Sequence, residues 1–184
     1  EAEKKKMGCG GSKRRCPESL LEKYLRETPF TSREINDIYA RFCELDTDED
    51  GTLSTEEFLD IEELGTNPLV LRVISVFDEN GDDSIDFDSF IRTMAVFHPS
   101  TDRETKLLFI FKLYDVQCNE KLYEEEIYQV MKMLVGGGLT EQQLRVISHR
   151  TIEECDSNQD GAVDQEEFIK AFEKTDVKQL SLKF

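Results

Sequence analysis

Four acidic segments of the chain recur inside the same apolar frame, and this repetition restricts the fold more than any other feature. They start at Asp46, Asp78, Asp115 and Asp156, at separations of 32, 37 and 41 residues. In each repeat one apolar residue lies four positions before the start and another lies twelve after it, in the pairs Phe42 and Phe58, Ile74 and Phe90, Phe111 and Ile127, and Ile152 and Phe168. We therefore expect four copies of one unit, a helix, a loop and a second helix.

A third apolar residue occupies the eighth position of every acidic segment, at Leu53, Ile85, Leu122 and Val163. An apolar side chain at this point suits a short strand that pairs with the strand of a neighbouring loop. We predict an all-α fold in which paired units form two lobes, residues 17–97 and residues 104–175. A linker at 98–103 joins them, and a tail at 176–184 follows.

Helix starts are marked by short oxygen-bearing side chains that stand three residues before Glu or Gln, in the pairs Thr31 and Glu34, Ser54 and Glu57, Thr101 and Glu104, Thr140 and Gln143, and Asp164 and Glu167. Such pairs can satisfy the free amides of a first helical turn. Asn67 and Pro68 predict another start, with proline in the first turn. The glycines at 136–138 predict the end of the sixth repeat helix.

The acidic segments have the length and composition of calcium-binding loops. Calcium takes six to eight oxygen ligands, which a twelve-residue loop supplies from positions 1, 3, 5, 7, 9 and 12. Position 7 contributes a backbone carbonyl, and position 12 is a glutamate that closes the site with both oxygens. Position 6 is a glycine because the chain turns there with a positive φ.

The first and fourth loops satisfy every one of these positions. In residues 46–57 the expected ligands are Asp46, Asp48, Asp50, the Thr52 carbonyl, Ser54 through a water, and Glu57. In residues 156–167 they are Asp156, Asn158, Asp160, the Ala162 carbonyl, Asp164 and Glu167. A solvated acidic turn would not place the glycine, the apolar eighth residue and the last glutamate together twice.

The second and third loops depart from the pattern. Residues 78–89 keep candidate ligands at Asp78, Asn80, Asp82, Ser84 and Asp86, but Asp83 and Ser89 stand where glycine and glutamate belong. Weak calcium binding or Mg²⁺, which needs only six ligands, is the expectation for this loop. Residues 115–126 keep Asp115 and Glu126 at the ends, with Gln117, Asn119, Glu120 and Tyr123 between them. For this loop a structural role beside its partner loop is the favoured interpretation.

Charge and cysteine usage exclude several classes of protein. The 184 residues carry a net charge of −17, so nucleic acid phosphates would be repelled. Five cysteines without paired spacing favour reduced thiols. The two histidines, His98 and His149, adjoin no nucleophile pattern, and no catalytic residue is predicted. With neither a long apolar run nor a secretory signal, we expect a cytoplasmic protein that is not an enzyme.

The N-terminal residues 1–16 are basic, with six Lys or Arg against two Glu. Within them Met7, Gly8 and Ser12 form the pattern for myristoylation of Gly8, provided that Met7 is the biological start and residues 1–6 are not native. One myristoyl chain holds a membrane only marginally, so a second signal is needed. We expect it from Lys13, Arg14 and Arg15, or from palmitate on Cys9 or Cys16.

Residues 30–172 resemble the EF-hand proteins of the calcineurin B and calcineurin B homologous protein branch. The resemblance is carried by NPLVLRVISVFD (67–78), KLLFIFKLYD (106–115), QVMKMLVG (129–136) and DGAVDQEEF (160–168). VFHP (96–99) and the start at Met7 are also similar to plant calcineurin B-like proteins. The second and third loops depart from the family, so the resemblance implies metal ligands only in loops one and four. It also implies N-terminal myristoylation.

The resemblance implies a calcium-dependent regulatory or adaptor protein. In such families an apolar groove receives an amphipathic helix from a partner, and calcium orders or opens that groove. The partner would be a phosphatase catalytic subunit or a sodium/proton exchanger. The alternatives are a regulator of a protein kinase, as in the plant proteins, and a passive calcium buffer that exposes no apolar surface. The apolar residues Val177, Leu180, Leu182 and Phe184 are expected to lie in the groove when no partner is bound.

Overall fold

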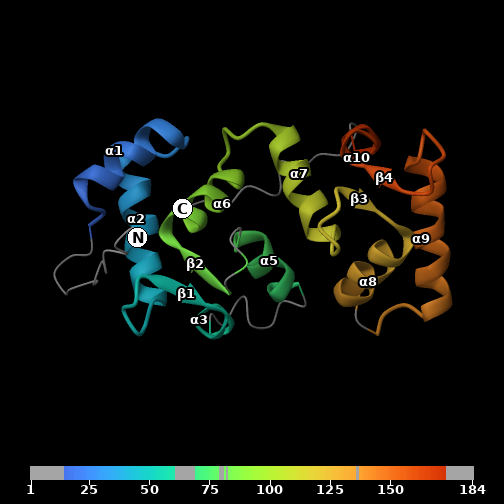
Figure 1. Ribbon diagram of the computed structural model, residues 1–184, viewed down its shortest axis with the longest axis horizontal. Helices are drawn as coiled ribbons and strands as arrows, with labels where there is room; N and C mark the ends of the chain where they lie inside the picture. Colours follow the sequence, from blue (N-terminus) through green and yellow to red (C-terminus); the bar gives the residue numbers. More distant parts are fainter. Residues whose placement is uncertain (1–14, 61–68, 79–80, 82, 136, 173–184) are drawn as a thin grey trace. The chain divides into compact units, whose positions relative to one another are not determined.

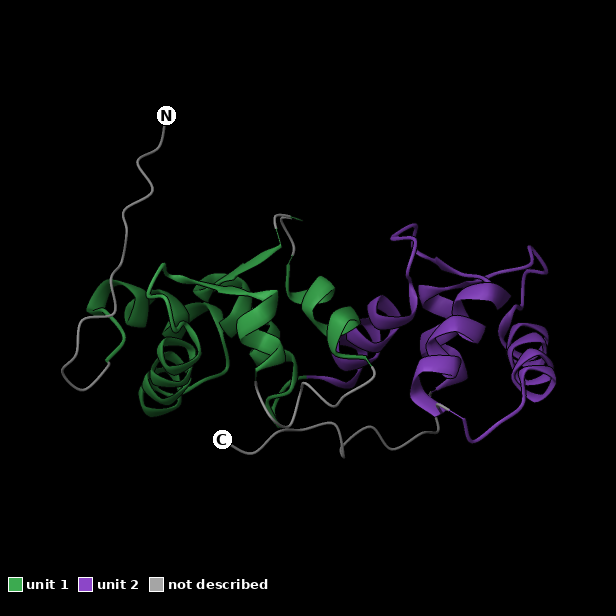
Figure 2. Cartoon of the chain, turned by 90° about the horizontal axis from the view of Figure 1, so that it is seen from below, with its two compact units in different colours: residues 1–101, 181–184 green, residues 102–180 purple. Residues whose placement is uncertain are grey.

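The structure is a computed structural model that describes residues 15–60, 69–78, 81, 83–135 and 137–172 (Figure 1). Among these residues the chain is mostly helical, with two small antiparallel sheets of two strands each. It divides into two compact units, the first ending at Thr101 and the second beginning at Asp102 (Figure 2). The predicted all-α fold of helix–loop–helix pairs is therefore confirmed. None of the helices in the described residues is long and apolar enough to cross a membrane.

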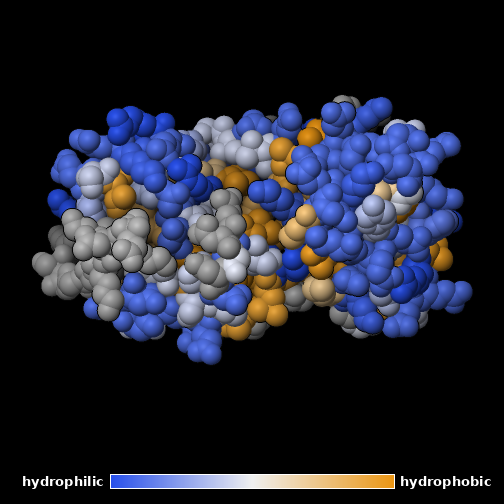
Figure 3. All heavy atoms as spheres, viewed as in Figure 1, coloured by the Kyte–Doolittle hydropathy of each residue, from blue (hydrophilic) through white to orange (hydrophobic). Residues whose placement is uncertain are grey.

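Each unit holds two helix–loop–helix repeats. The first unit contains α1 (Glu18–Glu27), α2 (Ser32–Leu45), β1 (Thr52–Ser54), α3 (Thr55–Leu59), α5 (Val70–Phe77), β2 (Ser84–Asp86) and α6 (Phe87–Val96). The second contains α7 (Arg103–Tyr114), β3 (Lys121–Leu122), α8 (Glu124–Val135), α9 (Glu141–Cys155), β4 (Val163–Asp164) and α10 (Gln165–Ala171). Hydrophilic side chains cover much of the visible surface, and hydrophobic side chains are visible around α5 (Figure 3).

The eighth loop residues pair across the strands as predicted. Leu53 lies opposite Ile85 in the β1–β2 pair, and Leu122 lies opposite Val163 in the β3–β4 pair. All four side chains are at most 2% exposed. This register points each apolar side chain into the core of its unit and leaves the polar positions of the loops on the opposite side of the strand.

Aromatic side chains fill much of the core of the first unit. The Phe87 ring packs edge-to-face against Tyr24, Tyr39 and Phe42, at centroid distances of 5.5, 4.9 and 5.3 Å. Phe58 makes similar contacts with Phe77, at 5.6 Å. In the second unit Phe111 and Phe168 meet at 5.5 Å. The aromatic residues that flank the loops in the sequence thus join the two repeats of each unit.

Most of the predicted helix starts are confirmed. Reciprocal capping boxes form at Thr31, Ser54, Thr140 and Asp164. The prediction at Thr101 is wrong: the cap of α7 is Asp102, whose carboxylate accepts from the Thr105 amide at 2.9 Å. The Thr101 hydroxyl donates to the Ala95 carbonyl instead, at 2.6 Å. The predicted start at residues 67–68 lies outside the described residues, and α8 ends at Val135, directly before the three glycines.

Helix α1 was not expected from the repeat pattern, and a polar cluster attaches it to α6. Asp88 of α6 pairs with Lys23, accepts from the Tyr24 hydroxyl at 2.9 Å, and accepts from Arg92 Nε at 2.7 Å. Arg92 also pairs with Glu27 at 2.5 Å. Although partial burial opposes ionisation, the bonds from Arg92, Lys23 and Tyr24 lower the pKa of Asp88 to about 2.

The loop backbones share one conformation despite their different sequences. The sixth position has a positive φ in all four loops, at Gly51 (91°), Asp83 (59°), Glu120 (61°) and Gly161 (87°). Glycine adopts such angles without cost, whereas a residue with a Cβ pays about 1 to 2 kcal/mol. The second and third loops therefore keep the same turn, although Asp83 and Glu120 stand where glycine is expected and adopt a strained backbone angle.

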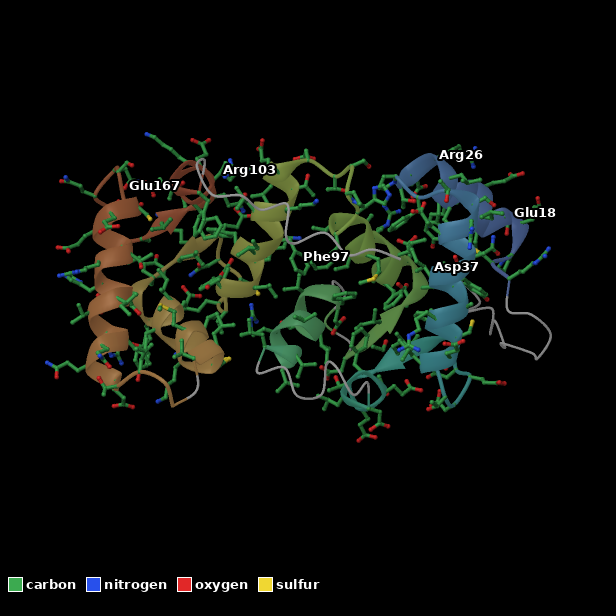
Figure 4. All side chains as sticks on the ribbon, turned by 180° about the vertical axis from the view of Figure 1, so that it is seen from behind. Glu18, Arg26, Asp37, Phe97, Arg103 and Glu167 are labelled. Carbon is green, nitrogen blue, oxygen red and sulfur yellow. The ribbon has the colours of Figure 1, made fainter. Side chains whose placement is uncertain are left out.

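We expect Asp88→Asn to lower the free energy of unfolding by about 1 to 2 kcal/mol, because it removes the shared charge that holds α1 to α6. The folded pKa of about 2 lies below the ordinary value of about 3.9. The contribution is therefore present above about pH 4 and is lost as the pH falls toward 2. Urea denaturation of both proteins across this pH range measures it. Asp37→Asn, at an exposed pair with Arg33 on α2, is the control and should change little (Figure 4).

We expect Glu120→Gly to raise the free energy of unfolding by up to about 1 kcal/mol, because it relieves the positive φ at this exposed position. Glu120→Ala removes the same charge but keeps a Cβ, so it should give no gain. Urea denaturation of the three proteins in the presence of a chelator makes the comparison. Equal stabilisation by alanine and glycine would show that charge, and not backbone strain, governs this position.

Candidate metal centres

The first loop gathers three carboxylates at its start. Asp46 ends α2 and is 1% exposed, and carboxylate oxygens of Asp46, Asp48 and Asp50 all lie within 4.8 Å of one another. Asp46 accepts from the amides of Asp50 and Gly51, each at 3.1 Å. Burial raises the pKa of Asp46 in spite of these bonds. Negative charge held this closely, and partly out of water, favours a bound cation.

Glu57 closes the first loop by joining its two ends. Its Oε1 accepts from the Thr47 amide at 2.6 Å, and its Oε2 accepts from the Ser54 amide at 2.9 Å. Burial acts to raise the pKa of this carboxyl, but the bonds from Ser54 and Thr47 hold it below its usual value. A charged carboxylate with both oxygens turned toward the loop is the group that the twelfth position requires.

The remaining candidate ligands of the first loop lie on β1. Strand pairing fixes the backbone at Thr52, whose amide donates to Asp50 at 2.8 Å. The Ser54 hydroxyl accepts from the Glu57 amide at 3.3 Å, so this side chain also caps α3. The structure thus brings together the carboxylates of the first, third and fifth positions, and it bonds the twelfth position to the ninth.

The fourth loop repeats this arrangement. Asp156 accepts from the amides of Asp160 at 3.2 Å and Gly161 at 2.8 Å. Glu167, at the start of α10 (Figure 4), accepts from Ser157 at 2.8 Å and from Asp164 at 3.2 Å. The Asp160 amide donates to Asn158 Oδ1 at 2.8 Å, and the Ala162 amide donates to Asp160 Oδ1 at 3.1 Å. These bonds hold the third, fifth and seventh positions next to one another. The donors are again oxygens of the hard type that calcium prefers.

A cation from the third loop reaches into the fourth, and the sequence reasoning did not identify it. Lys121 Nζ lies 2.6 Å from Asp160 Oδ2. The bond to Asp160 raises the pKa of Lys121, and the same bond lowers the pKa of Asp160. The sequence contains part of the information, because Lys121 directly precedes Leu122, the predicted strand residue. Pairing of that strand places Lys121 opposite Asp164 of the fourth loop.

The second loop lacks a closing carboxylate. Asp78 accepts from the amides of Gly81 at 2.8 Å and Asp83 at 2.9 Å, while Asn80 and Asp82 lie outside the described residues. Asp86 caps α6 through the Ser89 amide at 2.8 Å. The neighbouring Asp88 does not substitute for the missing glutamate, because its oxygens are engaged by Lys23, Tyr24 and Arg92.

The third loop keeps the frame of the site without its acidic centre. Asp115 accepts from Asn119 at 3.1 Å and from Glu120 at 2.9 Å. Glu126 is 1% exposed and accepts from Gln117 at 2.9 Å and from Tyr123 at 3.1 Å. These bonds reproduce the closure seen in the first and fourth loops. Backbone amides close this loop, and its structural role stays a prediction.

The donor sets of the first and fourth loops therefore fit a calcium ion, whereas those of the other two loops are incomplete among the described residues. Asp46, Asp48, Asp50 and Glu57 would hold it in the first loop, with Asp156, Asn158, Asp160 and Glu167 in the fourth. A bound cation would offset the negative charge of these carboxylates.

An apolar cavity of about 240 Å³ opens within the second unit. Its wall includes Met131, Phe168 and Phe172, and its rim includes Leu134 and Ile147, which are 47% and 36% exposed. Val163 of β4 also lines it, so the cavity wall and the fourth loop share a strand. The cavity is thus lined by apolar side chains and opens at an aliphatic rim.

The predicted lipidation sites Gly8 and Cys9 lie outside the described residues. Cys16 is described and is 6% exposed, with its amide bonded to Asn36 at 3.0 Å. Burial raises the pKa of its thiol to about 11. A buried, protonated thiol is a poor acyl acceptor, which argues against Cys16 as the second membrane anchor.

Comparisons with known proteins agree with this geometry. The family described as EF-hand domain pair matches residues 19–61 and residues 104–174. Calcineurin B of Naegleria gruberi is 44% identical over 171 residues, which cover 93% of this chain and 96% of the relative. Calcineurin B type 1 of Dictyostelium discoideum is 42% identical, over 81% and 83% of the two chains. Calcineurin B of Schizosaccharomyces pombe is 38% identical, over 81% and 86%.

The two EF-hand pairs, the oxygen-lined loops and these identities over most of the chain lead to one assignment. The chain belongs to the calcineurin B family of EF-hand proteins, which are calcium-binding regulatory subunits and not enzymes.

Proposed function

We propose that this protein binds two calcium ions, one in the first loop and one in the fourth, and that it regulates a partner protein in response. The observation that carries the proposal is the cluster of Asp46, Asp48 and Asp50, closed by Glu57. Asp156, Asn158, Asp160 and Glu167 repeat it in the other unit. The second loop would hold Mg²⁺ or calcium only weakly, because Ser89 offers no carboxylate.

Calorimetric titration of the metal-stripped chain should give two calcium ions per molecule. We expect Glu57→Gln and Glu167→Gln each to remove one, with at least about a tenfold loss of affinity at the altered loop, because a charged bidentate ligand is lost. Glu126→Gln is the matched control in the third loop and should leave both ions bound. No heat from the unaltered chain, or a loss on Glu126→Gln alone, would contradict the proposed sites.

The partner is proposed to be a calcineurin catalytic subunit, through an amphipathic helix. The relatives are named as subunits of calcineurin. The cavity in the second unit has an aliphatic rim and an aromatic wall, which suits the apolar face of a helix. Its wall shares β4 and α10 with the fourth loop, so cation binding there has a short route to the cavity. A passive buffer would need no such surface.

We expect Leu134→Glu to weaken the binding of a catalytic-subunit helix by about tenfold or more, because a half-exposed leucine at the rim would be buried by the partner. Fluorescence anisotropy of a labelled peptide, in calcium and in chelator, measures the effect. Leu25→Glu, at a similarly exposed leucine of α1, is the control and should bind normally. If the affinity of the peptide is the same for both variants and the unaltered chain, the peptide does not bind at this cavity.

Membrane contact is proposed to involve the N-terminal residues, through myristoylation of Gly8 and the basic side chains of Lys13, Arg14 and Arg15. A sodium/proton exchanger or a protein kinase stays an alternative partner. The peptide experiment distinguishes them when helices from each class are compared.

A further inference from the structure

The third and fourth loops meet in the β3–β4 pair, and Lys121 stands at their junction. Its backbone lies opposite Asp164, and its ammonium contacts Asp160 at 2.6 Å. Asp160 and Asp164 occupy the fifth and ninth positions of the fourth loop, which are both ligand positions. One lysine from a loop with an incomplete donor set therefore faces two ligands of a loop with a complete one.

The ammonium occupies one of the two oxygens that Asp160 could offer to a metal ion. Asp160 has two carboxylate oxygens, of which Oδ2 holds Lys121 while Oδ1 accepts from the Ala162 amide at 3.1 Å. A divalent cation in this loop would have to displace the ammonium from Oδ2 or bind beside a like charge. The two side chains are 42% and 37% exposed, so the ammonium has water to move into.

The first unit provides an internal comparison. There the intact loop pairs through β1, and the residue of the second loop that corresponds to Lys121 is Ser84, which lies opposite Ser54. Serine carries no charge. The two complete loops have similar donor sets, but only the fourth has a lysine at this place in its partner strand.

We infer that Lys121 acts as a tethered counter-ion that occupies the fourth loop in the absence of metal and weakens its binding of calcium. The inference rests on the proposed calcium site in that loop and adds a residue that sets its affinity. It also assigns a role to the third loop, which delivers a positive charge to its partner in place of binding a cation of its own.

The effect has the size of an exposed ion pair. Such pairs contribute at most about 1 kcal/mol, so removing the lysine should tighten calcium binding at the fourth loop by about two- to fivefold. Because the charges are exposed to solvent, the gain should shrink as ionic strength rises from about 0.05 M to about 0.5 M.

The experiment uses the full chain with Glu57→Gln, so that the fourth loop alone is titrated with calcium. Lys121→Met is compared with the same chain carrying Lys121, in low and high salt. Lys121→Arg keeps the charge and should retain the original affinity. Lys132→Met removes an equal charge from α8, where the lysine pairs with Glu141, and is the matched control. Circular dichroism and thermal unfolding verify that each variant is folded.

A two- to fivefold tighter affinity for Lys121→Met, lost in high salt and absent in the arginine and Lys132 variants, supports the inference. Unchanged or weaker binding by Lys121→Met overturns it, as does an equal gain with Lys132→Met. If the Glu57→Gln chain binds calcium and Glu167→Gln abolishes that binding, the proposed site stands whatever Lys121 does. If it binds none, the proposed function of this loop fails and the inference fails with it.

Discussion

A glutamate that reaches back across its own loop is the interaction on which each complete site depends. Glu57 and Glu167 accept from amides near the start of the loop and from an amide at the ninth position. This joins the end of one helix to the start of the next and holds the strand between them in register. The second loop has no such carboxylate at Ser89, although its backbone keeps the same positive φ at the sixth position, so what it lacks is the bond between its two ends and a ligand group.

The sequence predicts this part of the protein well because its physical signals are local. Spacing identifies the candidate ligands, and burial of the eighth residues Leu53, Ile85, Leu122 and Val163 sets the strand register. Capping boxes at Thr31, Ser54 and Thr140 depend only on neighbours three residues apart. At Thr101 two candidate caps stand side by side, and the carboxylate of Asp102 is the better acceptor for a helix start.

Features that depend on distant contacts were not predicted. Helix α1 belongs to no repeat, and its attachment depends on Lys23 and Glu27 meeting Asp88 and Arg92, each 65 residues away along the chain. The pair between Lys121 and Asp160 requires both the strand register and a particular side-chain direction. The cavity arises from how helices and strands of both repeats surround Met131 and Phe168, which no single stretch of sequence encodes.

The attachment of α1 also has a mechanical consequence. Lys23, Tyr24 and Glu27 are fastened to α6, the helix that leaves the second loop. A pulling force applied to the chain before Arg15 would therefore act on the ion pairs and the hydrogen bond between α1 and α6. It would reach α6 at Asp88 and Arg92. The second loop, with serine at its twelfth position, is thus followed by a helix that α1 holds through Asp88 and Arg92, whereas the first loop is closed by its own Glu57.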